Sequence, residues 1–191
     1  TEIKHLTVSA LLVIGVGLSI FRGNLLYTEP VILAILAVIF ASIFLLHEIA
    51  HKLVAQHYGL WAEFRLFLTG ALLTLLSVVS PIKFIAPGAV MIGGPASKDV
   101  MGKTSVAGPL TNIALSLVTY ALASLFEGLL SFQFFFAIML SAAFNAWIAL
   151  FNLIPIGVLD GLKVFQWNKI IWGLTFTLSL ALTALTFNYV F

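Results

Sequence analysis

Cysteine is absent from this chain of 191 residues. The chain can therefore form no disulfide bond and can offer no thiolate to a metal ion. Any metal site must be built from histidine, aspartate and glutamate side chains, whose imidazole and carboxylate groups are the remaining strong ligands. The lack of cysteine also leaves the redox compartment unreadable.

Charged residues are scarce as well. Asp, Glu, Lys and Arg make up 8% of the chain, and its formal net charge at pH 7 is only +2. No basic patch of the kind that binds nucleic acid is present, so nucleic acid is excluded as a partner. Hydrophobic residues make up 62% of the chain, which is too many for a soluble core within a polar shell. The composition indicates an integral membrane protein that lies in a lipid bilayer.

Long apolar stretches predict the helices. A membrane-spanning helix needs about 20 apolar residues, and five stretches come near that length. They are residues 6–21, 31–58, 105–126, 132–154 and 170–190. The first has the charge order of a signal peptide, but no A-x-A cleavage site follows it, and we interpret it as a helix.

A sixth apolar stretch, residues 66–80, determines the topology of the chain after it. If it dips into the membrane and returns, eight of the nine Lys and Arg residues share one side and only Arg22 is opposite. If it spans, the split is three against six. The positive-inside bias favours the first arrangement and makes the crowded side cytoplasmic. The eight cations are Lys4, Lys52, Arg65, Lys83, Lys98, Lys103, Lys163 and Lys169.

The segment after this stretch, KFIAPGAVMIGG, predicts a short β-hairpin over residues 84–92, because Pro87-Gly88 suits the centre of a type II turn. We therefore expect an all-α polytopic membrane protein with about five to six transmembrane helices. A re-entrant segment and the hairpin lie between its second and third core elements. A single membrane domain covers 1–191, with its core at 31–165 and flanking helices at 6–21 and 170–190.

The motif HEIAH inside the second stretch carries the clearest chemistry. His47 and His51 are four residues apart, so on a helix both imidazoles face the same way and can bind one metal ion. Glu48 lies beside them, where H-E-x-x-H zinc sites hold the general base that activates water. The alternative is that these polar groups are buried by chance and satisfy one another. Ionisable groups inside a membrane are costly and usually functional, which favours the metal.

A catalytic zinc site usually takes three protein ligands, so a third must be found. His57 has metzincin-like spacing, but Val54 stands where those enzymes have glycine, and a continuous helix points His57 away from the pair. Asp160 is the better candidate. Pro155 ends the preceding helix, and the topology returns Asp160-Gly161 to the side where the histidine helix ends. On its own, Asp160 would be read as a turn residue.

The paired motifs resemble the site-2 protease family of intramembrane zinc metalloproteases. H-E-x-x-H at 47–51 is followed by N-x-x-P-x-x-x-x-D-G at 152–161, and AGPLTN at 107–112 resembles the G-P-x-x-N element of that family. The resemblance implies a Zn²⁺ ion held by His47, His51 and Asp160, with Glu48 as the general base. It also implies a minimal prokaryotic or archaeal member, without PDZ or CBS modules.

The expected function is therefore zinc-dependent hydrolysis of peptide bonds within transmembrane segments of membrane proteins, as in regulated intramembrane proteolysis. The partner is a substrate helix, the location is the cell membrane, and the site lies nearer the cytoplasmic face. Asn152 and Asn112 are candidates for binding the substrate backbone, or for interhelical hydrogen bonds. The hairpin could pair with an unwound substrate or shield the metal. The alternatives are a metal-ion transporter and an inactive metal-binding scaffold.

Overall fold

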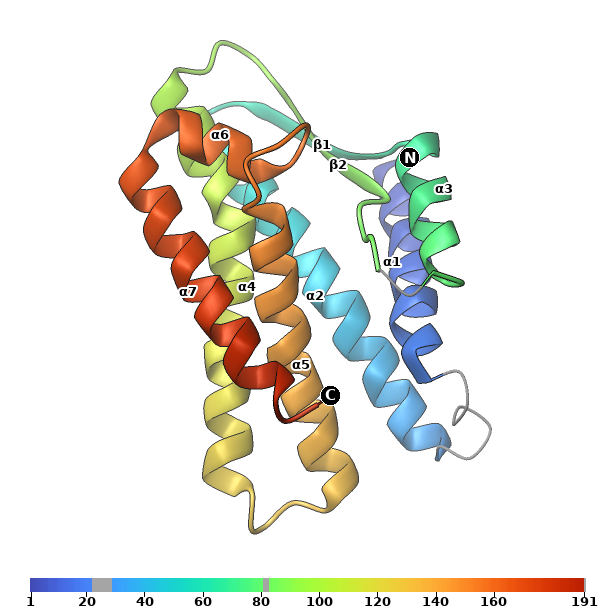
Figure 1. Ribbon diagram of the computed structural model, residues 1–191. Coiled ribbons are helices and arrows are strands. Elements are labelled where there is room, and N and C mark those ends of the chain that lie inside the picture. Colours follow the sequence, from blue (N-terminus) through green and yellow to red (C-terminus); the bar gives the residue numbers. More distant parts are fainter. Residues whose placement is uncertain (22–28, 81–82, 191) are drawn as a thin grey trace.

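A computed structural model describes residues 1–21, 29–80 and 83–190. Five helices within these ranges are long and apolar enough to cross a membrane, which is compatible with a multi-pass membrane protein. They are α1 (Glu2–Leu18, continued by the 3-10 turn η1, Ser19–Phe21), α2 (Pro30–His57), α4 (Lys98–Phe126), α5 (Phe132–Asn152) and α7 (Lys169–Phe187). In the bundle, α4 packs against α2 and α5, α7 packs against α5, and α1 packs against α2 (Figure 1). The five predicted helices are confirmed.

The ends of these helices follow from local sequence signals. Pro30 occupies the first turn of α2, where its missing N–H costs nothing, and Gly59 follows the helix with a φ of 74°. Asn168 caps α7, because its side-chain oxygen accepts the backbone N–H groups of Ile170 and Ile171 in the first turn. Ser97 caps α4 by accepting the N–H of Val100, so α4 begins at Lys98 rather than at residue 105.

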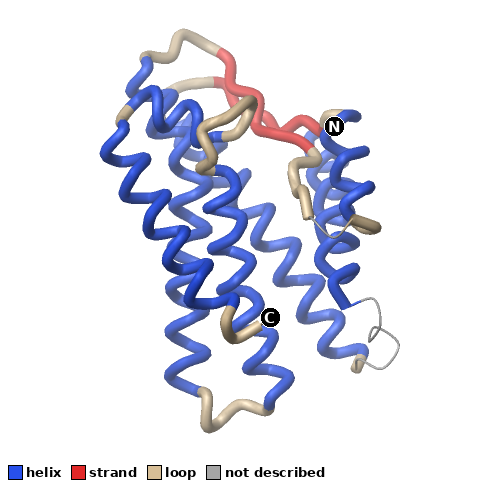
Figure 2. Tube along the Cα trace, viewed as in Figure 1, coloured by secondary structure: helices blue, strands red, loops and turns tan. Residues whose placement is uncertain are grey.

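Two strands, β1 (Trp61–Leu66) and β2 (Gly88–Gly93), form an antiparallel sheet at one end of the bundle (Figure 2). The antiparallel pair predicted between the second and third core elements is therefore present, but its strands differ from those of the expected hairpin over 84–92. Pro87 does not turn the chain. Its carbonyl accepts the N–H of Phe67 at 3.1 Å and continues the ladder. The partner of β2 is a distant segment, which a local turn signal could not reveal.

The segment between the strands leaves the sheet and returns to it. Its helix α3 (Leu68–Ser77) has 10 residues, which makes it roughly 15 Å long, about half the thickness of a bilayer core. The segment begins and ends at neighbouring positions, because Leu66 pairs with Gly88. The stretch 66–80 therefore dips in and returns, as the re-entrant interpretation requires.

The outer edge of β1 is occupied by α1. Hydrogen-bonded pairs alternate along an antiparallel ladder, so the bond at Phe67 places the N–H of Phe64 on the outer edge. That N–H donates to Glu2 Oε1 at 2.9 Å. Glu2 also forms an ion pair with Lys52 of α2, with the closest N–O distance at 2.6 Å. Lys52 thus joins α2 to α1.

The outer edge of β2 has different surroundings. The same alternation turns the backbone N–H and C=O groups of Gly88, Val90 and Ile92 away from β1. All three residues line the cavity that contains HEIAH. The sheet therefore presents one edge held by α1 and one edge that borders the cavity.

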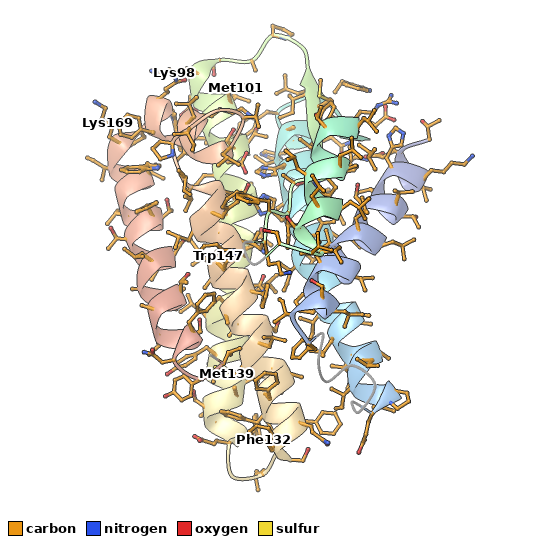
Figure 3. All side chains as sticks on the ribbon, turned by 45° about the vertical axis from the view of Figure 1, so that its right-hand side comes forward. Lys98, Met101, Phe132, Met139, Trp147 and Lys169 are labelled. Atoms are coloured by element: carbon orange, nitrogen blue, oxygen red, sulfur yellow. The ribbon has the colours of Figure 1, made fainter. Side chains whose placement is uncertain are left out.

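Seven of the eight cations predicted to share a side lie at the end of the bundle that holds the sheet. Figure 3 shows Lys98 and Lys169 at this end and Phe132 at the other. Lys83 differs from the prediction, because its Nζ donates to Ser19 Oγ and to the carbonyls of Ser77 and Ser80, at 2.9 Å each. It lies deeper, where it satisfies carbonyls at the end of α3. Arg22 lies outside the described residues.

Helix α2 is held in position by Phe40, which is buried between α1 and α5. Its ring meets the ring of Phe144 edge-on at 5.1 Å between centroids. On its other side it faces Gly17 of α1, where a Cβ atom would overlap the ring. This close approach of α1 to α2 fixes the helix that carries both histidines.

We expect Gly17→Ala to lower the free energy of unfolding by about 1–3 kcal/mol, the usual cost of overpacking, because the Phe40 ring has no room to move. Gly15→Ala is the matched control on the same helix, since a Cβ there meets nothing within 4 Å. It should be neutral or slightly stabilising, because alanine favours helix. Thermal unfolding of both variants in one detergent provides the comparison. Equal stability of the two would contradict the close packing.

Candidate metal centre

His47 and His51 lie one above the other on the inner face of α2. Both are buried, and their rings meet edge-on with centroids 4.7 Å apart. The two Nε2 atoms are 3.1 Å apart. The spacing predicted this shared face, and the continuous helix provides it.

Asp160 brings a carboxylate to the same place from a different part of the chain. Its Oδ2 is 3.4 Å from His47 Nε2 and 3.1 Å from His51 Nε2. One ligand atom from each of these three residues lies within 4.8 Å of the other two, so the group could hold a metal ion. Asp160 was expected on a turn, but it is the first residue of helix α6 (Asp160–Trp167), whose N-terminus favours a carboxylate.

Two tryptophans hold α6 in this position. Trp172 on α7 meets the ring of Phe165 on α6 edge-on, with centroids 5.0 Å apart, and its indole N–H donates to the carbonyl of Leu153 at the end of α5 at 2.8 Å. Trp167, the last residue of α6, donates its indole N–H to Asp99 on the first turn of α4 at 3.1 Å. The helix that bears Asp160 is therefore held between α4 and α7.

The outer nitrogens of both imidazoles have acceptor partners. His51 Nδ1 donates to the backbone carbonyl of Thr104 at 2.7 Å, and His47 Nδ1 is bonded to Asn112 Oδ1. A carbonyl oxygen cannot donate, so each Nδ1 carries a proton, and the neutral imidazole then has its lone pair on Nε2, facing Asp160. Partners of this kind fix the orientation of metal-binding histidines.

This donor set fits a divalent cation. Three lone pairs at about 3 Å repel one another in an apolar interior, and a shared proton satisfies only two of them. A metal ion satisfies all three. Helix α4 also leaves room for an ion, because Gly108 faces the pair and a Cβ atom there would overlap both Nε2 atoms. Imidazole and carboxylate ligands in this number suit zinc.

A cavity of about 480 Å³ opens beside this centre. Most of its lining is apolar, from α2, α3, β2 and α5. Glu48 also lines it, next to the backbone of Val90 on β2. Its Oε2 is buried and has no hydrogen-bond partner among the residues that the structure describes. An unpaired carboxylate oxygen is costly in such surroundings, and it suits a group that accepts a proton during a reaction.

The other residues considered from sequence are placed differently. Asn152 lines the cavity and donates to the carbonyl of Ile148 at 3.0 Å. Asn112 is completely buried behind His47 and is not part of the cavity lining. His57 is exposed and stacks edge-on against Tyr58, and His5 lies on α1 outside the metal-binding group.

Sequence reasoning missed Thr104 and Asn145. Thr104 acts through its backbone carbonyl, which every residue has, so the sequence contains no signal for it. Asn145 bonds to Asn112 and so connects to His47. Its position on the buried face of α5 was the available signal, because buried amides must find partners.

The comparison with known proteins agrees with this centre. A protein of Methanocaldococcus jannaschii named "Putative zinc metalloprotease MJ0611" is 40% identical over 151 residues, which are 75% of this chain and 74% of that protein. The chain belongs to this zinc metalloprotease family. No family model matches the chain, and no solved structure matches it.

Gly161, next to Asp160 in this metalloprotease, packs directly against the end of α5. A Cβ atom at Gly161 would overlap the backbone carbonyl of Leu153. Backbone cannot give way as a side chain can, so Gly161→Ala must shift α6 and move Asp160. We expect zinc affinity, measured by competition with a chelator, to fall about 10-fold or more. Gly173→Ala on α7, where a Cβ has open space, is the control and should bind normally. Unchanged affinity in Gly161→Ala would argue against Asp160 as a ligand.

Proposed function

We propose that the protein is an intramembrane zinc endopeptidase of the site-2 protease type, which cleaves peptide bonds within transmembrane segments of membrane proteins. The observation that carries this proposal is the convergence of His47, His51 and Asp160 beside Glu48, on helices apolar enough to cross a membrane. The 40% identity to a protein named as a putative zinc metalloprotease supports zinc-dependent peptide hydrolysis.

In this proposal the two imidazoles and the carboxylate hold zinc through His47 Nε2, His51 Nε2 and Asp160 Oδ2. Zinc bound there supplies Lewis acidity, which lowers the pKa of water toward about 7 and polarises a peptide carbonyl. Two neutral imidazoles and one carboxylate would bring a single negative charge to a divalent ion, so the loaded centre would stay positive and favour an anionic transition state.

Glu48 moves the proton. Its unpaired Oε2 accepts a proton from the water that attacks the carbonyl carbon, and the same oxygen then delivers that proton to the leaving amine as the C–N bond breaks. The apolar lining excludes bulk water, which strengthens these electrostatic effects. Glu48 is thus base in the first half of the reaction and acid in the second.

The substrate must be unwound before its backbone can reach the centre, because a helix hides its carbonyls in hydrogen bonds. The outward N–H and C=O groups of Gly88, Val90 and Ile92 can pair with an extended substrate as an added third strand. Asn152 is the better of the two predicted substrate-binding residues, because it lines the cavity and its donated bond leaves Oδ1 to accept a substrate N–H.

The proposed location is the cell membrane, with the centre nearer the cytoplasmic face. His47 is about 25 Å along α2 from Pro30 and is closer to the end that carries most of the lysines. The positive-inside bias assigns that end to the cytoplasm.

Glu48→Gln tests the mechanism. It should retain zinc, because Glu48 is not a ligand, and should lose about 10²- to 10⁴-fold in the rate of cleaving a transmembrane peptide in lipid. Glu127→Gln, the same change at an exposed position at the other end of α4, should cleave normally. Zinc content and product formation are measured on the same preparations.

The outcomes separate the alternatives. Zinc movement into sealed vesicles without peptide cleavage would indicate a transporter, and stoichiometric zinc with neither transport nor cleavage would indicate a scaffold. Equal cleavage by Glu48→Gln and the unaltered chain would contradict the assigned base.

Val90→Pro tests strand addition. It removes an outward N–H of β2 but none of the bonds to β1, so the sheet is retained. We expect kcat/KM for a transmembrane substrate to fall about 10-fold, and that for a short extended peptide to fall less. Val90→Ala, which keeps the N–H, is the matched control. Equal losses for both substrates would instead indicate damage to Glu48, next to Val90.

A further inference from the structure

A chain of buried amides connects α5 to the metal centre through α4. Asn112 on α4 is bonded to His47 Nδ1 through Oδ1, and its Nδ2 donates to Asn145 Oδ1 on α5 at 2.8 Å. Asn145 Nδ2 in turn donates to the carbonyl of Ser141 at 2.9 Å. Both asparagines are almost completely buried. We call this set, His47, Asn112, Asn145 and Ser141, the amide relay.

Every polar group of the two amides is used. Asn112 Nδ2 has a second acceptor in the backbone carbonyl of Ile43 at 3.2 Å, and Asn145 Nδ2 has one in Ser141 Oγ at 3.4 Å. Both amide oxygens accept one bond. In an apolar interior a full set of partners of this kind allows only one arrangement without an unsatisfied group.

Two backbone carbonyls determine which way the side-chain amides of Asn112 and Asn145 are turned. The carbonyls of Ile43 and Ser141 can only accept, so they require the Nδ2 groups of Asn112 and Asn145 to face them. A flipped Asn112 would set its oxygen against the Ile43 carbonyl and the Asn145 oxygen. The oxygen of Asn112 must therefore face His47, and His47 Nδ1 must carry the proton.

We propose that Asn112 and Asn145 are positioning residues that fix the ring orientation and tautomer of His47, so that its Nε2 lone pair is directed at the metal. This inference rests on the proposed function in that it takes zinc as the ion of the centre. In this proposal Asn112 contacts the side of the His47 ring that faces away from the metal, and it does not contact substrate.

The two histidines are held by different means. His51 is bonded to a backbone carbonyl, which substitution at Thr104 would leave in place. His47 depends on side chains, which substitution can remove. Zinc affinity should therefore respond to Asn112 and Asn145, although neither touches the ion.

Zinc affinity of the full chain, measured by competition with a chelator, tests the relay. Asn112→Leu should weaken binding about 10- to 100-fold, as loss of an outer hydrogen-bond partner of a ligand does. Asn145→Leu removes one bond to Asn112 and should weaken binding about 3- to 10-fold. The absorption spectrum of the cobalt-loaded protein should change in both variants, because it follows the ligand geometry.

Ser116→Ala is the matched control. Ser116 is also fully buried, lies one turn after Asn112 on α4, and donates to the carbonyl of Ala142 on α5 at 2.8 Å. It joins the same two helices without touching the relay. Ser116→Ala and Asn145→Leu should both lower thermal stability, but only Asn145→Leu should change zinc affinity and the cobalt spectrum.

The outcomes separate the relay from the proposed function. If the unaltered chain binds zinc and Asn145→Leu binds it as Ser116→Ala does, the relay is wrong and the proposed function is untouched. If Asn112→Leu also retains full affinity, the ring of His47 does not depend on either amide. An unaltered chain that holds no zinc would contradict both proposals.

Discussion

Repulsion between lone pairs in an apolar interior is the constraint on which this structure depends. His47 Nε2, His51 Nε2 and Asp160 Oδ2 face one another at 3.1 to 3.4 Å, with little water to screen them. Such an arrangement is stable only around a positive charge. The packing reflects this, since Gly108 leaves the volume free and the partners on the outer nitrogens turn both Nε2 atoms toward it.

Much of the fold could be predicted because it depends on local sequence. Apolar length is sufficient to locate a membrane helix, and a spacing of four is sufficient to align His47 with His51. Two arguments indicated Asp160: a zinc site needs a third protein ligand, and the distribution of Lys and Arg residues places this aspartate on the side of the histidines. The turn signal alone would have left Asp160 as a structural residue. The re-entrant path followed from the same count, although Lys83 proved to lie deeper than the count assumed.

The remaining features depend on contacts between distant segments. The partner of β2 is β1, on the other side of α3, and no local pattern encodes that register. Thr104 contributes a backbone oxygen, so its side chain carries no information about its role. Asn112 was predicted as a residue of the site, but only the helix packing shows that it lies behind His47 rather than in the cavity.

The three residues that could hold a metal ion also differ in how they are attached to the fold. The two histidines share one long helix that is packed on both sides, so their relation to each other is rigid. Asp160 stands on the eight-residue helix α6, which Trp167 joins to the first turn of α4 and which Trp172 contacts from the first turn of α7. A displacement of either turn would therefore move Asp160 and leave the two histidines in place. Helix α7 offers no atom to the group of three, yet its first turn helps to set where the Asp160 carboxylate lies.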